Sequence, residues 1–324
     1  MGRIFYTASS YTAPYDNINQ LVETPLICSK LDLYRCIMTV GNPSYITKTD
    51  IRNYGLWRAV SNSIIQKCLI VFTNIQSGED LNLHPIYNDY VSDQKRIVSY
   101  NLGMAVAKYY AEKLLSIPNL IHVESLKKQG AITFLDTTSK LEPDLVGMSE
   151  NGEWHVFEAK GTTAKHLNSK IKEAKDQGGN VDTIHGLVPS TITACATSFG
   201  EDRIFSKIVD PPSQKGVKKI VIDPEKFYET YYSPYFALEE FSSPRGKTSR
   251  LRGEDFRMLS LKANNLDIEV GLDLEIYELL VDRKFDDIEQ FYIRNQSSVI
   301  DRQIDSENNR ISRGLDGFIV RYGG

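Results

Sequence analysis

Residues 141–161, LEPDLVGMSENGEWHVFEAKG, are the stretch that most constrains the fold of this chain. Two apolar runs, at 145–146 and 154–157, flank a turn signal at 149–152 (SENG). Asn-Gly between apolar runs is among the strongest short-range signals for a β-hairpin. The stretch therefore predicts two neighbouring antiparallel strands joined by a tight turn.

Three ionisable residues fall at the open end of this predicted hairpin. Asp144 follows Pro143 at the start of the first strand, and Glu158 and Lys160 end the second. Side chains alternate faces along a strand, so Glu158 and Lys160 share a face, and pairing across the turn can bring Asp144 beside Glu158. Converging carboxylates are hard oxygen ligands for Mg²⁺ or Mn²⁺. A neighbouring lysine can orient or deprotonate a water and stabilise charge on a phosphate. This set of residues indicates metal-assisted hydrolysis of phosphodiesters.

The pattern Pro143-Asp144, followed one strand later by Glu158-Ala159-Lys160, resembles the PD-(D/E)xK nuclease superfamily, which includes the restriction-endonuclease-like folds. The resemblance implies that Asp144 and Glu158, helped by the backbone carbonyl of Ala159, hold Mg²⁺ (or Mn²⁺). It implies that Lys160 positions the water or steadies developing charge. The alternative is an ordinary hairpin whose surface carries an accidental Glu-x-Lys.

The fold implied is α/β, with a restriction-endonuclease-like core in which helices flank a central mixed β-sheet. The resemblance covers about residues 99 to 200, where the predicted order of elements is helix, three strands, helix, strand. The helices are expected at 99–117 and from about 162 to 177, and the first core strand at 120–126. We expect three regions: an N-terminal α/β region at 1–98, the nuclease core at 99–210 and a C-terminal α/β region at 211–324.

Two helical residues are further candidates by resemblance. In the superfamily a helix before the core strands often carries a glutamate that reaches the metal, which points to Glu112 as a ligand. Several branches carry a glutamine on the helix after the Glu-x-Lys pattern, which points to Gln177 as a catalytic residue. A glutamate on a helix is otherwise a solvated surface residue. Glu142, two residues before Asp144, is a reserve ligand.

Two basic segments are candidates for contact with a phosphate backbone. The helix that follows the predicted catalytic strand carries one group, and a loop at 242–257 carries the other. The candidate residues are Lys165, Lys172 and Lys175 in the helix, and Arg245, Lys247, Arg250 and Arg252 in the loop. A solvated amphipathic helix and a mobile loop are the simpler interpretations.

Apolar runs and turn signals predict the remaining elements. Strands are expected at 31–40, 67–75, 132–135, 184–199, 217–222, 266–276 and 318–322. Helices are expected at 51–65, at 285–293 and from Asp223-Pro224 onward, and Pro234 should bend or end the last of these.

Composition sets wide limits on function. The chain has 324 residues, 41% hydrophobic and 25% charged, which is typical of a globular protein. Its net charge of −4 argues mildly against a general nucleic-acid binder, although local charge matters more. Four cysteines without a Cys-x-x-Cys motif indicate neither a zinc site nor disulfides. With no targeting or membrane-spanning segment in the sequence, we expect a cytoplasmic protein without membrane contact.

These observations lead to one functional hypothesis and its alternatives. We expect a Mg²⁺-dependent endonuclease that acts on nucleic acid, more readily DNA than RNA, in restriction, repair or antiviral defence. One alternative is a module that binds nucleic acid without cleaving it. The other is a nuclease subunit activated by a partner. A homodimer would suit double-strand cutting. The sequence has no Walker motif, so an ATPase motor would have to come from a partner protein.

Overall fold

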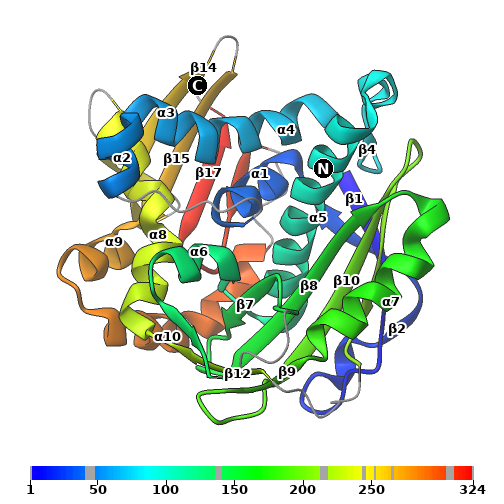
Figure 1. Ribbon diagram of the computed structural model, residues 1–324. Coiled ribbons are helices and arrows are strands. Elements are labelled where there is room, and N and C mark those ends of the chain that lie inside the picture. The colour runs from blue at the N-terminus through cyan, green and yellow to red at the C-terminus, as the bar shows by residue number, and fades with distance from the viewer. Residues whose placement is uncertain are drawn as a thin grey trace.

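The computed structural model of the protein describes residues 2–40, 48–135, 141–211, 218–242, 246–251, 253–263, 266–303 and 310–322. Within these ranges, the side chains at 48–49, 62–63, 262–263, 266 and 295–303 are not described. The fold is mixed α/β, with a large mixed sheet flanked by helices (Figure 1).

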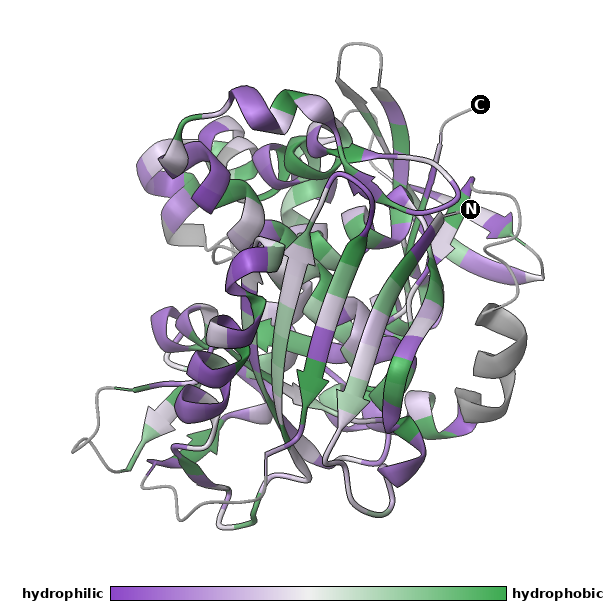
Figure 2. Ribbon diagram, turned by 90° about the vertical axis from the view of Figure 1, so that its right-hand side faces the viewer, coloured by the Kyte–Doolittle hydropathy of each residue, from purple (hydrophilic) through white to green (hydrophobic). Residues whose placement is uncertain are grey.

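The large sheet has seven strands in the order β2-β1-β11-β10-β8-β7-β5. Figure 2 shows its long strands side by side. β8 is antiparallel to β7 and parallel to β10. The strands are β1 (Gly2–Ser9), β2 (Gln20–Cys28), β5 (Asn119–His122), β7 (Leu145–Met148), β8 (Trp154–Thr162), β10 (Thr191–Phe199) and β11 (Ile204–Val209).

The described residues also form three smaller sheets. A three-stranded sheet consists of β6 (Ile132–Phe134), β12 (Lys218–Ile222) and β9 (Val181–Ile184). A five-stranded sheet consists of β13 (Lys247–Leu251), β14 (Glu254–Ala263), β15 (Leu266–Asp273), β17 (Phe318–Tyr322) and β16 (Ile311–Arg313). A two-stranded sheet pairs β3 (Ile75–Gln76) with β4 (Asn82–Leu83).

The helices cover both faces of the large sheet and fill the space between the sheets (Figure 1). They are α1 (Lys30–Thr39), α2 (Lys48–Tyr54), α3 (Leu56–Val60), α4 (Gln66–Asn74), α5 (Ser92–Leu115), α6 (Val123–Lys128), α7 (Leu167–Gly178), α8 (Pro224–Phe241), α9 (Leu274–Val281) and α10 (Phe285–Gln303). Shorter turns are η1 (Asp16–Ile18), the π-helical η2 (Ser61–Ile65), η3 (Pro85–Asp89) and η4 (Ala164–His166).

The hairpin predicted at 141–161 is present as β7 and β8. Leu145 pairs with Phe157 and Val146 with Val156. Gly152 in the turn has a φ of +75°, a backbone conformation that a glycine adopts without steric cost. The local turn signal was therefore sufficient to predict both strands and their pairing.

Helices α5 and α7 contact opposite faces of β8. A Cβ atom at Gly161 would overlap the carbonyl oxygen of Ser99 on α5, and one at Gly103 would lie 2.8 Å from the Gly161 nitrogen. On α7, a Cβ at Gly178 would lie 3.3 Å from Cγ of Glu158. Residues 158 and 161 of a strand point to opposite faces. Glu158 therefore faces α7, and the backbone of Gly161 lies directly against α5.

Two predicted strands are helices instead. The run at 31–40 forms α1, and the run at 67–75 forms α4. Ser29 and Asp32 cap α1 reciprocally, each side chain accepting from the other's backbone N–H. Every residue of α1 from Leu31 to Thr39 is buried, so no polar face marks the helical period in its sequence. A short, fully buried apolar run cannot be assigned by periodicity alone.

Other boundaries differ in smaller ways. The strand predicted at 120–126 ends at His122, whose side chain caps α6 by accepting from the Glu124 N–H. Pro234 does not end α8, which continues to Phe241. The described part of the predicted loop at 242–257 contains β13 and the start of β14, which pair as a hairpin. The helix predicted at 99–117 is α5, which begins seven residues earlier, at Ser92.

The main hydrophobic core extends from the large sheet through α1 and α5 to α8 and the five-stranded sheet. Tyr231, Tyr232 and Tyr235 of α8 are buried and pack around Phe318 of β17. Among the described residues, no helix has the length and apolar character needed to cross a bilayer.

Candidate active site

Asp144, Glu158 and Lys160 meet at the open end of the β7–β8 hairpin. Nζ of Lys160 donates to Asp144 Oδ2 at 2.9 Å and to Glu158 Oε2 at 3.2 Å. The Asp144 N–H donates to Glu158 Oε1 at 2.9 Å, and the Ala159 N–H donates to Asp144 Oδ2 at 3.2 Å. The two carboxylates therefore converge on one ammonium, as strand alternation predicts. We call these three side chains the hairpin cluster.

The environment of the hairpin cluster changes its protonation. Burial, and then the charge of Asp144, raises the pKa of the Glu158 carboxyl well above its ordinary value. Burial by itself would lower the pKa of Lys160, but the charges of Asp144 and Glu158 outweigh it and raise that pKa. Lys160 is therefore a stable ammonium here, and one positive group faces two acids. A further cation would favour ionisation of the Glu158 carboxyl.

Small residues around β8 leave space for these polar groups. In the register of β8 with β10, Glu158 lies beside Ala194 and Lys160 beside Ala196. Glu158 is completely buried, whereas the side chains of Lys160 and Asp144 are 15% and 22% exposed. The cluster thus has a buried floor and an edge that solvent or a ligand can reach.

The donor chemistry of the hairpin cluster fits a hard divalent cation. Mg²⁺ is commonly held by one or two carboxylates, with waters and substrate phosphates as its other ligands. Asp144 and Glu158 supply two carboxylates at one point, and no described residue donates a hydrogen bond to Asp144 Oδ1. Within the described ranges, no group of three or more His, Cys, Asp or Glu side chains is arranged to hold a metal. The chain therefore offers a two-carboxylate site rather than a complete protein cage.

Gln177 lies in the last turn of α7, next to the glycine that contacts Glu158. Its Oε1 is buried, and no described residue donates a hydrogen bond to it. A buried amide oxygen without a donor is costly, and such groups often mark a functional position. Gln177 thus carries an unused acceptor one residue before the glycine that lies against Glu158.

Glu112 does not reach this site, which corrects the expectation that it is a metal ligand. Its carboxylate is fully buried and accepts two hydrogen bonds from the Arg35 guanidinium, at 2.7 and 2.9 Å. It lies nine residues beyond Gly103, which is roughly 13 Å along the helix axis. The reserve ligand Glu142 is also engaged elsewhere, in an ion pair of 2.8 Å with Lys127.

The basic residues predicted to bind phosphate fall into two separate regions. Lys165 in η4 and Lys172 on α7 are exposed, and Lys175 is half-buried. None of these three forms an ion pair with a described residue, whereas Lys170 pairs with Glu173 at 2.6 Å. Lys165, the first of these lysines, lies three residues after the end of β8.

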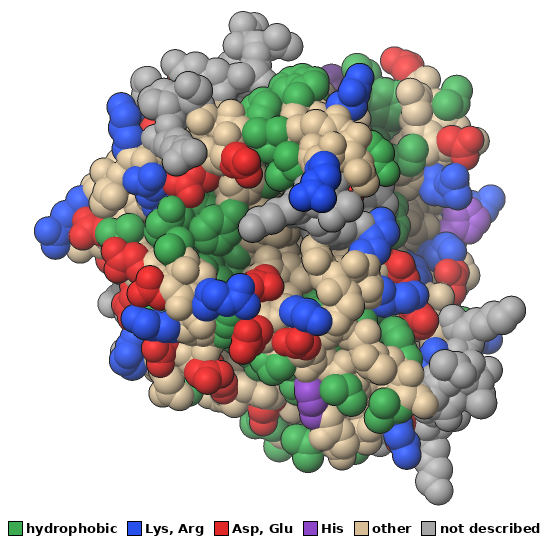
Figure 3. Space-filling view, turned by 60° about the vertical axis from the view of Figure 1, so that its left-hand side comes forward, with side chains coloured by type: hydrophobic (Ala, Val, Ile, Leu, Met, Phe, Trp, Pro, Cys, Tyr) green, Lys and Arg blue, Asp and Glu red, His purple; other side chains and the backbone are tan. Residues whose placement is uncertain are grey.

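The other basic group lies apart from the hairpin cluster. Lys247 and Arg250 are exposed on β13, which pairs with β14. Figure 1 shows β14 and α7 at opposite sides of the molecule, so these two residues do not flank the site as expected. Arg245 and Arg252 lie outside the described residues. Figure 3 shows acidic and basic side chains interspersed on the face that it presents, without a single-sign field.

Tyr100 and His122 are polar neighbours of the hairpin that sequence reasoning missed. Tyr100 Oη lies 2.8 Å from His122 Nε2. Their side chains meet across 22 residues of sequence, so no local pattern connects them. The one available signal was a histidine within the strand predicted at 120–126.

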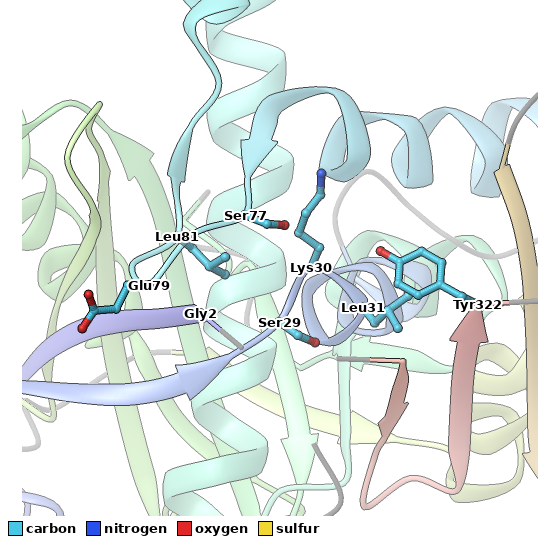
Figure 4. A pocket seen from close by; sticks show the side chains of 9 residues that line it. Gly2, Ser29, Lys30, Leu31, Ser77, Glu79, Leu81 and Tyr322 are labelled. Carbon is cyan, nitrogen blue, oxygen red and sulfur yellow. The ribbon is translucent and has the colours of Figure 1, made fainter. Parts of the chain in front are cut away.

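A cavity of about 430 Å³ lies elsewhere, at the start of α1 (Figure 4). Its charged lining residues are already paired: Lys30 donates to the Phe72 carbonyl oxygen, and Glu79 bonds Arg3 at 2.9 Å. Figure 4 shows Glu79 pointing away from Lys30. The cavity therefore lacks the convergent ionisable groups that the hairpin cluster has.

Comparisons of the chain with protein-family models, with curated proteins and with solved structures found no match in any of the three.

Proposed function

We propose that this protein is a Mg²⁺-dependent nuclease with a restriction-endonuclease-like core, hydrolysing phosphodiester bonds of nucleic acid, more readily DNA than RNA. The observation that carries the proposal is the convergence of Asp144 and Glu158 on the ammonium of Lys160. An acid beside a lysine is by itself only a structural ion pair. A buried glutamate with a raised pKa, beside an acid and a lysine that are only partly buried, is better suited to a cation and an anionic substrate.

Each residue has a distinct role in this proposal. Asp144 and Glu158 would hold the ion, with the Ala159 carbonyl as a further oxygen donor. A bound Mg²⁺ supplies Lewis-acid polarisation of the phosphate and a water of lowered pKa. The Lys160 ammonium orients the attacking water and offsets negative charge on the phosphate. It does so as a cation, because its raised pKa makes it a poor base before metal binds. Gln177 offers its free Oε1 to hold a water or a nucleotide donor.

The order of elements supports the same proposal. Helix α5 precedes the strands β5, β7 and β8, and helix α7 precedes β10, with these four strands adjacent in the sheet. With α6, β6 and β9 left aside, these elements follow the helix, three strands, helix, strand order that the resemblance implies. The α7 face with Lys165, Lys172 and Lys175 starts beside the cluster, where it can follow a phosphate backbone. We propose that the protein acts in restriction, repair or defence against foreign DNA, in the cytoplasm. It would do so as a homodimer or with a partner protein.

One experiment tests the proposal directly. The protein is incubated with plasmid, single-stranded DNA and RNA, with Mg²⁺ and with EDTA. We expect Mg²⁺-dependent cleavage by the parent and none by Asp144→Asn, a variant of nearly identical shape. Binding without cleavage would instead support a non-cleaving module, and cleavage by both proteins would point to a contaminating nuclease.

A further inference from the structure

Tyr100 and His122 adjoin the hairpin cluster and have no role in the function proposed above. Tyr100 lies on α5, and His122 ends β5, which pairs with β7. Val123, the next residue, donates its N–H to the Asp144 carbonyl oxygen at 3.0 Å. The Tyr100–His122 pair is therefore connected through the backbone to the residue that begins the hairpin.

The hydrogen bonds of His122 determine where its ring carries a proton. Nδ1 accepts from the backbone N–H of Glu124 at 3.1 Å, so this nitrogen presents a lone pair and bears no hydrogen. A neutral imidazole then carries its hydrogen on Nε2. Burial lowers the pKa of His122 to about 4, which keeps the ring neutral near pH 7. Nε2–H consequently donates to Tyr100 Oη.

This direction leaves the phenol hydrogen of Tyr100 available. Oη already accepts from His122, and no described residue accepts from the Tyr100 hydroxyl. The residue is half-buried rather than enclosed in the core. Burial, and then the charges of Asp144 and Glu158, raise the pKa of Tyr100, so the phenol keeps its hydrogen. Tyr100 is thus a protonated donor whose oxygen is hydrogen-bonded to His122, and the charges of Asp144 and Glu158 both act on it.

We propose that Tyr100 donates this hydrogen to a non-bridging oxygen of the phosphate at the hairpin cluster, with His122 as the positioning residue that directs the hydroxyl. An anionic phosphate oxygen is a strong acceptor for such a donor, because charge-assisted hydrogen bonds are about twice as strong as neutral ones. This inference rests on the proposed function, since it needs a phosphate at that point.

The principal test compares Tyr100→Phe with Tyr110→Phe. Tyr110 lies on the same helix, but its hydroxyl donates to the Phe5 carbonyl oxygen at 3.2 Å in the interior. Both variants lose one hydroxyl. We expect Tyr100→Phe to lower the single-turnover rate with Mg²⁺ by roughly tenfold to a hundredfold, the usual effect of one hydrogen bond to a charged group. Tyr110→Phe should keep the parent's rate once thermal melting confirms that it is folded.

A modified substrate identifies the acceptor. One non-bridging oxygen at the mapped cleavage site is replaced by methyl as a methylphosphonate, in each stereochemical form. If Tyr100 bonds that oxygen, Tyr100→Phe should lose little further rate on the form that lacks it, because the two changes remove the same interaction. Equal losses on all substrates would overturn the assignment.

The role of His122 has its own control pair. His122→Gln keeps an amide N–H near the position of Nε2, whereas the shorter His122→Asn does not. We expect the glutamine variant to recover most of the parent's rate and the asparagine variant to match Tyr100→Phe. Equal rates for the two His122 variants would overturn the positioning role.

Binding distinguishes failure of this inference from failure of the proposed function. Affinity for a short DNA oligonucleotide is measured in EDTA for the parent and both tyrosine variants. A parent that binds but never cuts overturns the nuclease proposal, and Tyr100 is then judged by affinity, which should fall several-fold in Tyr100→Phe alone. Equal affinities in that case, or equal rates in a cutting parent, overturn the Tyr100 proposal. A parent that neither binds nor cuts overturns both.

Discussion

Two of the charged clusters among the described residues differ in charge balance and in exposure. The hairpin cluster places two acids against Lys160 at the edge of the large sheet. A second group, which we call the anchor cluster, places Arg35 and Lys108 against Glu112 and Asp316, with all four side chains at most 2% exposed. Each cluster contains one completely buried glutamate, so the two can be compared directly.

The two glutamates respond to burial in opposite ways. Burial tends to raise the pKa of both carboxyls. For Glu112 the charges of Arg35 and Lys108 outweigh burial, and its pKa is lowered. For Glu158 burial and the charge of Asp144 outweigh Lys160, and its pKa is raised. A balanced, enclosed cluster holds segments together, whereas an unbalanced cluster with an open edge is suited to bind a cation.

The anchor cluster should dominate stability. Arg35→Met removes the guanidinium that bonds both Glu112 oxygens and leaves two buried acids with fewer partners. We expect a loss of about 3–5 kcal/mol in the free energy of unfolding, as for other broken buried ion pairs. Urea titration of parent and variant measures it. A loss below about 1 kcal/mol would show that the cluster does not hold α1, α5 and the C-terminal segment together.

The hairpin cluster should dominate activity. Lys160→Ala keeps both carboxylates but removes the ammonium that would offset charge on the phosphate. We expect the single-turnover rate at saturating Mg²⁺ to fall a hundredfold or more, on the order of 3 kcal/mol. Folding and DNA binding should remain. Lys160→Arg should recover only part of the rate, because its planar fork differs from a compact ammonium. Near-equal rates for parent and Lys160→Ala would reject this active site.

The same substitution in the two clusters should change stability in opposite directions. Relative to the ordinary value of 4.5, the lowered pKa of Glu112 stabilises the fold above that pH, and this stabilisation is lost as pH falls. The raised pKa of Glu158 has the reverse sign, because its ionisation costs stability as pH rises above 4.5. In EDTA at pH 8, Glu112→Gln should therefore lower the melting temperature and Glu158→Gln should raise it. Shifts of the same sign would remove the contrast between the clusters.

The smallest effects are expected on the surface. Replacing Lys165, Lys172 and Lys175 with alanine should weaken DNA binding and flatten its dependence on salt by up to about three units of log–log slope, because each phosphate contact releases counterions. Lys247→Ala with Arg250→Ala is the matched control, since β13 lies apart from α7. An unchanged slope in the α7 variant would exclude this face from the interface, and a reduced slope in the control would place β13 in it.

Local sequence determined the hairpin and most of its surroundings. The Asn-Gly turn and the alternation of Asp144, Glu158 and Lys160 depend on neighbours within a few residues, so the pairing and the shared face could be predicted. The helical period of α5, the Asp223-Pro224 start of α8 and the short strand β17 are equally local signals.

Tertiary structure alone decided the partners of the remaining charges. Glu112 has the spacing expected of a metal ligand, but packing of α1 on α5 brings Arg35 to it from 77 residues away. The run that forms α1 is too uniformly buried for its period to identify it as a helix, and the run that forms α4 is apolar on its outer side too, where Leu69 is 43% exposed. Tyr100 and His122 meet because β5 pairs with β7 beneath α5. A sequence pattern records which face of an element is apolar, whereas the partner of a buried charge depends on how distant elements pack.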